Sequence, residues 1–291
     1  MQRYRAVLEA IYRLYEHSGF TMAGAVAFSF VVSVFPFCIF LGALAGIFGG
    51  RELAQQAVEQ LFQILPQRVA EGIAPQVESI MGNTRIDLLT ASAGLALFFA
   101  TNAIETLRAA LNGAYRVTET RPYLLCLLRS MLFVFISAVS MLALTWAVVV
   151  GPVMAARLDP TFTVPILKST LFGATLRYAF AATVIGAQLF AFHLWLAAGE
   201  RRIKDVWPGV LLSMVLWLAA ASLYSYYLDF SDYTRFYAGL SQLMVALIFF
   251  QMTAVIVILG AELNRGILEL KKLTNGKNGN NGTRLAQAAA G

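Results

Sequence analysis

Charged side chains are scarce in this chain. Of its 291 residues, 13% are Asp, Glu, Lys or Arg and 59% are hydrophobic, whereas an ordinary soluble domain carries about 25% charged residues. Cysteine is rarer still: Cys38 and Cys126 lie in or beside apolar segments, and neither has a partner at the spacing of a metal site or a redox motif. This composition argues against a soluble fold and predicts that both cysteines are small buried hydrophobes.

Common catalytic motifs are also missing from the sequence. There is no H-E-x-x-H, no G-x-S-x-G and no Walker loop, and the two histidines, His17 and His193, stand 176 residues apart. Acidic residues do not cluster in the apolar segments as a metal-dependent hydrolase would require. We therefore expect no enzymatic activity, no metal and no cofactor. Without a nucleotide site, a self-contained ATP-driven pump is also disfavoured.

What the chain has in quantity is long apolar segments. Six of them are long enough to cross the roughly 30 Å hydrocarbon core of a bilayer as helices, namely 21–48, 86–107, 124–154, 171–197, 207–228 and 239–262. The second is the weakest because Thr101, Asn102 and Glu105 make its later half polar, and a partly re-entrant segment is the alternative there. The sequence thus predicts an all-α, polytopic membrane protein with six transmembrane helices plus short amphipathic helices.

Lysine and arginine are unevenly divided between the connections. The two termini and the connections on their side hold 15 of these residues, against six on the opposite side. Because positively charged connections stay in the cytoplasm, both termini are predicted to be cytoplasmic. The formal net charge of +6 then reflects topology and attraction to anionic headgroups, and we expect no nucleic-acid partner.

Three segments are predicted to lie outside the bilayer. Residues 1–20 contain an amphipathic helix, suited either to the surface of the cytoplasmic leaflet or to packing on the protein's own loops. Within the membrane domain at 21–270, residues 50–85 predict an outer cap of two or three short amphipathic helices. That cap would cover a cavity, dock a partner or lie on the membrane. Residues 271–291, rich in Gly and Asn, predict a disordered cytoplasmic tail.

Pro36 stands near the middle of the first apolar segment. Proline lacks a backbone donor and clashes with the carbonyl four residues earlier, so we expect an irregular helix whose freed groups find partners on neighbouring helices, hydroxyls or water. Ser29 and Ser33 lie on the relevant side. Gly42 and Gly46 form a G-x-x-x-G pair, which predicts close helix packing and leaves a homo-oligomer as a second use.

Polar residues inside the predicted spans are candidates for contact with a substrate or cavity. Asn102, Glu105, Arg108 and Asn112 form one stripe that should face the interior of the bundle, with Glu105 and Arg108 spaced to pair. Arg177 suits either an anionic group or the lipid headgroups, to which a long side chain extends.

Two glutamines extend this polar set. Gln188 and Gln251 are expected to fasten helices together, since buried amides commonly do so. His193 has no carboxylate or histidine at metal spacing. Glu262 ends the last span, where an ion pair with Arg108 or Arg129 is one interpretation.

Several motifs together resemble the BrkB/YihY family of bacterial inner-membrane proteins. They are S-x-F-P ending at Pro36, W-P-G starting at Trp207 and L-G-A-E-L around Glu262, within a similarity that covers roughly residues 20–266. The resemblance implies six spans with cytoplasmic ends in the inner membrane. Some members carried a ribonuclease label, against which the missing catalytic residues argue, and members have been suggested to help move lipids or lipid-linked material.

Two functions fit these observations. The first is a transporter or flippase-like protein for a lipid or other amphiphilic anionic substrate, with a cavity lined by the polar stripe and Arg177. The alternative is a non-transporting scaffold for envelope-assembly proteins, which predicts a densely packed bundle. Membrane lipids are the expected partners in both cases.

Overall fold

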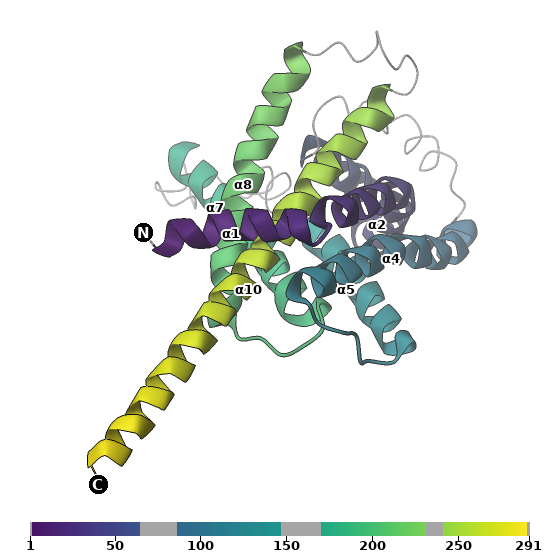
Figure 1. Cartoon of the computed structure of the whole chain (residues 1–291). Helices are drawn as coiled ribbons and strands as arrows, with labels where there is room; N and C mark the ends of the chain where they lie inside the picture. Colours follow the sequence, from purple (N-terminus) through teal and green to yellow (C-terminus); the bar gives the residue numbers. More distant parts are fainter. Residues whose placement is uncertain (1, 65–85, 147–169, 231–240, 290–291) are drawn as a thin grey trace, which may run out of the picture.

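The structure is a helical bundle. A computed structural model describes residues 2–64, 86–146, 170–230 and 241–289, and within these ranges every regular element is a helix (Figure 1). In chain order they are α1 (Gln2–Glu16), α2 (Gly19–Ile64), α4 (Ile86–Tyr115), α5 (Tyr123–Thr145), α7 (Thr170–Ala191), the π-helical turn η2 (Phe192–Leu196), α8 (Ile203–Phe230) and α10 (Ser241–Ala289). The predicted all-α class is therefore confirmed for the described part of the chain.

Parts of four helices are long and apolar enough to cross a membrane. They are Tyr123–Thr145, Ala179–Leu196, Ile203–Ala220 and Leu243–Lys272, and a fifth is counted if Leu8–Glu16 and Gly19–Val34 form one bent span. Their outer faces keep large apolar side chains exposed, such as Leu128 and Leu218, as helices surrounded by lipid do. The described residues thus support a membrane-embedded bundle, whereas the predicted number of six spans is not confirmed by them.

α1 and α2 meet at a sharp bend. The axes of Leu8–Glu16 and Gly19–Val34 differ by 75°, and the chain turns at Ser18, whose φ of 56° is left-handed. The amphipathic helix predicted within residues 1–20 is present as α1. Of the two alternatives for it, packing on the protein itself is seen directly, because α1 lies across α10 (Figure 1).

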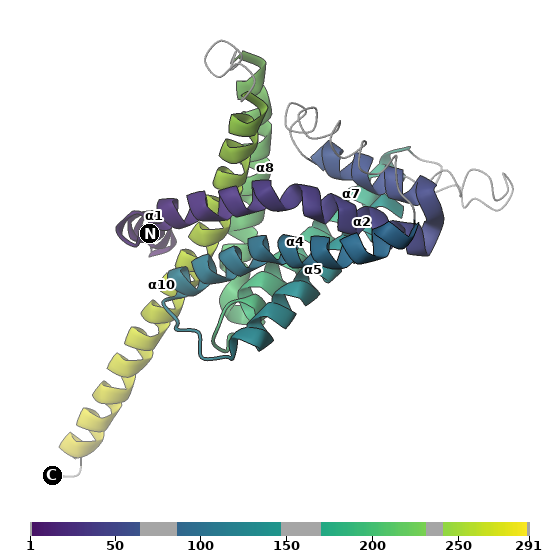
Figure 2. The same ribbon diagram turned by 90° about the vertical axis from the view of Figure 1, so that its right-hand side faces the viewer.

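α2 is one helix of 46 residues that passes through Pro36. It runs beside α4 and is crossed by α10 (Figure 2), and Leu41, Leu111 and Ile258 of these three helices are fully buried. The first part of the predicted cap, residues 50–64, continues α2 instead of forming a separate short helix. The rest of the cap, residues 65–85, lies outside the described residues.

α8 and α10 come together through two glycines. A Cβ atom placed on Gly209 would lie 2.1 Å from the Gly260 carbonyl oxygen, and one placed on Gly260 would lie 2.8 Å from the Gly209 carbonyl oxygen. Both distances are shorter than a Cβ atom tolerates against backbone, so only glycine permits this close approach of the two helices. The W-P-G and L-G-A-E-L motifs supply these two glycines, and their packing fixes where the two helices cross.

α10 continues to Ala289, which differs from the prediction of a disordered tail from residue 271. Gly and Asn weaken a helix but do not block it, whereas proline does. The last proline of the sequence is Pro208, so no such residue interrupts α10. Once a helix has formed, each further residue adds a hydrogen bond without a new nucleation step.

Candidate functional site

A chain of ion pairs joins the C-terminal end of α4 to the loop that follows it. Arg108 Nη2 lies 2.5 Å from Glu105 Oε2, and Arg108 Nη1 lies 2.7 Å from Glu119 Oε2. Arg121 holds Glu119 from its other side, with Nε 2.6 Å from Oε1, and the Ser130 hydroxyl on α5 donates to Glu105. The predicted pairing of Glu105 with Arg108 is confirmed, and the structure extends it by two residues of the loop.

Glu119 is the centre of this chain. Hydrogen bonds from Arg121 hold the pKa of the Glu119 carboxyl well below its usual range, and those from Arg108 and Asn112 act in the same direction. The carboxylate in turn raises the pKa of the Arg121 guanidinium. Both charges are therefore stable at neutral pH, because each protonation state is favoured by the other.

Asn112 and Arg121 connect the ion-pair chain to the segment after η2. Asn112 Nδ2 donates to Glu119 Oε2 at 3.1 Å, while its Oδ1 accepts the Ala198 N–H at 2.7 Å. Arg121 Nη2 also donates to the Leu196 carbonyl at 3.1 Å. The two loops at this end of the bundle are thus tied together through side chains of α4 and its loop.

A second polar group is buried where α4, η2, α8 and α10 meet. The Tyr115 hydroxyl lies 2.9 Å from His193 Nδ1 and accepts a hydrogen bond from Asn264 Nδ2 at 3.2 Å. Asn264 Oδ1 accepts the Gly209 N–H at 2.7 Å. Above the tyrosine, Arg201 Cζ lies 3.7 Å from the ring centroid. We call this group and the ion-pair chain together the polar junction: Glu105, Arg108, Asn112, Tyr115, Glu119, Arg121, His193, Arg201, Gly209 and Asn264.

Arg201 is held by neutral groups. Its guanidinium donates to the carbonyls of His193, at 2.9 Å, and Ala198, and it stacks on Tyr115. Burial lowers the pKa of Arg201, although arginine stays charged at any pH at which proteins fold. The contact of a partly desolvated cation with an aromatic face is one of the stronger cation–π arrangements, so Arg201 fastens the loop after η2 to α4.

Glu262 is a buried carboxylate on α10. Glu262 is 1% exposed, and its Oε2 atom lies 4.0 Å from Arg116 Nη2. This Glu262 Oε2 atom has no hydrogen-bond partner in the described part of the chain. Arg116 Nη2 also lies 2.7 Å from His17 Nδ1. The prediction that Glu262 pairs with Arg108 or Arg129 was therefore wrong. Arg108 pairs with Glu105 and Glu119, and the arginine beside Glu262 is Arg116.

Arg116 occupies a position that usually belongs to glycine. The Arg116 N–H bonds the Gly113 carbonyl and the Val117 N–H bonds the Asn112 carbonyl, which is the Schellman pattern at the end of α4. Arg116 takes the left-handed conformation of that motif, with φ 52°, at a cost of about 1 kcal/mol for a residue with a side chain. From this position its guanidinium reaches to 4.0 Å from Glu262.

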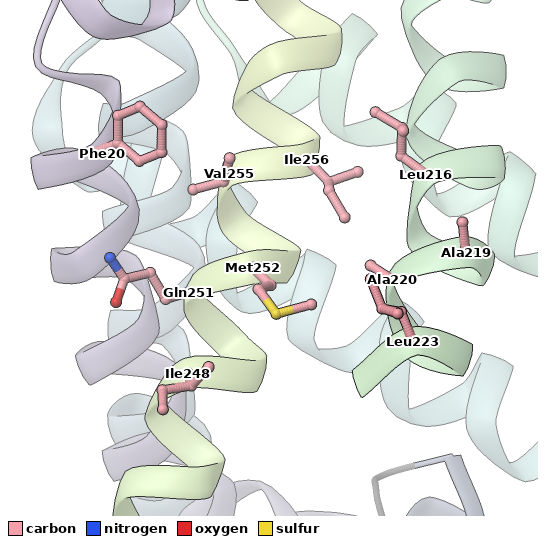
Figure 3. A pocket seen from close by; sticks show the side chains of 10 residues that line it. All are labelled: Phe20, Leu216, Ala219, Ala220, Leu223, Ile248, Gln251, Met252, Val255 and Ile256. Atoms are coloured by element: carbon pink, nitrogen blue, oxygen red, sulfur yellow. The ribbon is translucent and has the colours of Figure 1, made fainter. Parts of the chain in front are cut away.

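An apolar groove runs between α8 and α10. It has a volume of about 510 Å³, within the range of roughly 300–1,000 Å³ typical of ligand sites. Figure 3 shows side chains from α8 and α10 facing each other across it, with Phe20 of α2 near one end. Gln251 is the single polar residue of its lining, which consists of Phe20, Leu216, Ala219, Ala220, Leu223, Ile248, Gln251, Met252, Val255 and Ile256.

The two serines near Pro36 bind α4 across the helix interface. Ser29 Oγ lies 3.0 Å from Thr106 Oγ1, which itself donates to the Asn102 carbonyl, so Ser29 is the donor. Ser33 Oγ donates to the Phe99 carbonyl at 3.2 Å. Both serines are buried, and they join two helices instead of lining the groove. Pro36 is partly buried within α2 and is likewise absent from the groove lining.

The predicted polar stripe on α4 is only partly correct. Glu105, Arg108 and Asn112 turn into the polar junction, but the side chain of Asn102 is exposed. Asn102 and Arg108 are six residues apart. Because a helix turns by 100° per residue, their side chains point about 120° apart around the helix axis. The one-stripe interpretation therefore extended too far toward the N-terminal half of α4.

The remaining predicted residues fall in three different places. Gln188 donates to Ser137 Oγ, so it joins α7 to α5 as expected. Gln251 was expected to fasten two helices together. It is instead exposed and lines the groove. Arg177 belongs to α7, but its side chain lies outside the described residues. The described parts of the chain contain no group of three or more His, Cys, Asp or Glu residues that could hold a metal ion.

Several junction residues were missed from the sequence. Tyr115 ends α4 and Glu119 lies in the loop after it, where polar residues are common and carry no periodic signal. Asn264 lies within α10, just beyond the predicted end of the last span. His193 was noticed, but only the packing of η2 brings it to Tyr115. One signal was available: Asn264 follows Glu262 by two residues at the end of an apolar span, where uncompensated polar groups are costly.

The sequence is similar to known proteins over most of its length. Residues 10–284 match the family model described as virulence factor BrkB. The chain is also similar to the ribonuclease-like protein YfkH of Bacillus subtilis (strain 168), with 25% identity over 265 residues that cover 88% of this chain and 93% of that protein. No solved structure matches significantly.

Proposed function

Because the chain belongs to the virulence factor BrkB family and carries an apolar groove between two candidate membrane spans, we propose that it binds a membrane lipid and moves it within the bilayer. Its substrate would be a lipid or another amphiphilic molecule with an anionic headgroup. One observation carries the proposal: a groove of about 510 Å³ is lined almost entirely by alkyl and aromatic side chains, which match an acyl chain.

The groove contributes shape more than driving force. Lipid tails are as apolar as the side chains that line it, so a chain leaving the bilayer for the groove gains little hydrophobic free energy. Preference for one lipid must therefore come from its headgroup. Arg116 is a candidate for that contact, since its side chain is 32% exposed and is bonded to His17, three residues before Phe20 of the groove.

Photocrosslinking in vesicles tests the proposal. A phospholipid with a diazirine in its acyl chain is expected to label α8 and α10 at the groove, and Ala220→Trp should reduce that labelling several-fold by filling the space. Ala187→Trp is the matched control, because Ala187 is exposed on α7 and does not line the groove. Equal labelling of both variants and the wild type would reject the groove as a lipid site.

Lipid movement is measured separately. In vesicles with a fluorescent lipid in both leaflets, wild-type protein should make the inner-leaflet lipid accessible to an external quencher, and Ala220→Trp should slow this step. Arg116→Gln should weaken the preference for anionic over zwitterionic lipids without removing the labelling. Groove labelling without any movement would contradict transport while retaining lipid binding.

A scaffold that recruits envelope proteins is the second candidate. The observation in its favour is the polar junction, in which polar groups of α4, η2, α8, α10 and two loops are tightly bonded. Such a rigid end is suited to presenting a fixed surface. A ribonuclease-like name belongs to the Bacillus relative; the site found in this chain is an apolar groove, which is unsuited to RNA, and we do not propose that activity.

A further inference from the structure

One face of α1 is used to hold the helix to the rest of the protein. Ala10 and Leu14 are each 2% exposed. Arg13, between them, places Nη1 2.6 Å from Glu269 Oε2 on α10 and Nη2 2.5 Å from Glu9 Oε1 within α1. Arg265 also pairs with Glu269, at 2.5 Å. α1 is therefore docked on α10 by a small apolar contact and a network of three charged pairs.

The other face of α1 is apolar and has no contact with the described protein that buries it. Leu8, Ile11, Tyr12 and Tyr15 are exposed by 49%, 47%, 65% and 77%. Their spacing of three, four and seven residues places them in one stripe along the helix. Four large apolar or aromatic residues in a single exposed row indicate a surface that something covers.

The orientation of this stripe identifies what covers it. α1 meets α2 at 75°, so if α2 crosses the bilayer, α1 lies close to the membrane plane. Tyrosine, which supplies half of the stripe, is enriched at the level of the headgroups, where one end of the ring is apolar and the other wet. Residues 3 and 5 of α1 are also arginines, and arginine attracts anionic lipids.

We infer that α1 is a membrane-surface helix, inserted through Leu8, Ile11, Tyr12 and Tyr15 among the headgroups of an anionic leaflet and moored to α10 through Arg13. The two alternatives that the sequence left open for this helix are then both realised, one on each side. The inference does not depend on lipid transport, since it concerns a different surface and would hold for a scaffold as well.

The test measures the depth of single positions on α1 in the full-length protein. Tyr12→Cys is labelled with an environment-sensitive fluorophore, in vesicles with or without phosphatidylglycerol. Glu16→Cys is the control, because Glu16 is also exposed on α1 but lies about 90° around the helix from the stripe. The two native cysteines, Cys38 and Cys126, are each 1% exposed and are expected to react little.

The expected result is blue-shifted emission at position 12, with quenching by lipids spin-labelled near the headgroup roughly threefold stronger than at position 16, since an interfacial helix buries only its apolar face. Removing phosphatidylglycerol should reduce that difference. Equal, water-like emission at both positions in anionic vesicles would overturn the inference. Protection of position 12 that persists unchanged in detergent, without lipid quenching, would overturn it too and point to a protein partner.

Discussion

The polar junction and the groove share helix α10, but they are built in opposite ways. In the junction, charged and polar side chains from distant parts of the chain satisfy one another, as Glu119 does with Arg108 and Arg121. In the groove, apolar side chains face each other across open space. The difference shows which region holds the helices together more firmly. Breaking the polar junction leaves desolvated polar groups without hydrogen-bond partners. Separating the apolar side chains of the groove costs little, because lipid tails can replace their contacts.

The largest effect is expected at the glycine contact between α8 and α10, which includes Gly209 of the polar junction. Gly209→Ala would place a Cβ atom 2.1 Å from the Gly260 carbonyl oxygen and 2.5 Å from Asn264 Nδ2. Since backbone cannot yield as a flexible side chain does, we expect a loss of about 3 kcal/mol in stability from overpacking, measured by unfolding in detergent. Gly24→Ala is the control: nothing lies within 4 Å of its Cβ position, so it should be neutral or slightly stabilising. Equal stability of the two variants would contradict the close contact.

An intermediate effect is expected at Glu119, and it depends on pH. Glu119→Gln leaves Arg108 and Arg121 without their shared carboxylate, for an expected loss of about 1–3 kcal/mol at pH 7. The folded pKa of Glu119 is lowered from the ordinary value of 4.5, so its contribution is complete above pH 4.5 and is lost as the pH falls below it. Thermal unfolding of both proteins at pH 7 tests the size of the loss, and the same measurement at pH 4 tests its dependence on pH. Glu200→Gln serves as control, because Glu200 is an exposed glutamate in a loop. If the difference in stability between wild type and Glu119→Gln were as large at pH 4 as at pH 7, the lowered pKa of Glu119 would be contradicted.

The smallest effect is expected where one amide joins two helices away from both regions. Gln188 bonds Ser137 across α7 and α5, and such contacts in membrane bundles are worth about 0.6 kcal/mol. A double-mutant cycle of Gln188→Leu and Ser137→Ala in detergent should return a coupling of that size. A coupling as large as the loss at Glu119 would erase the distinction between the junction and the rest of the bundle.

Helix positions were predictable because hydrophobic length is a strong signal. The predicted segment 124–154 begins within one residue of α5, and 86–107 lies inside α4. The fate of individual polar residues was less predictable. Glu105 and Arg108 pair through local spacing, which the sequence contains, whereas Glu262 meets Arg116 only because α4 ends beside α10.

The groove was beyond the reach of sequence reasoning for a similar reason. A search for polar residues in apolar segments selects Ser33 and Asn102, but a site for a lipid tail is made of residues that look like any other part of a span. Leu216 and Met252 become notable only when α8 and α10 leave a space between them. Gln251 was selected for its polarity and proved to be the one candidate that lines this space.

At the Gly209–Gly260 contact, α10 is held directly against the backbone of α8. Along the helix, the groove residue Ile248 lies roughly 18 Å to one side of Gly260, and Glu269, which holds α1, lies roughly 14 Å to the other. A lipid chain that wedges α10 away from α8 would pivot the helix about the glycines, because they cannot approach further. The opposite arm carries Glu269 and, through its ion pair with Arg13, the surface helix α1, so the groove and α1 share one rigid helix with the glycine contact between them.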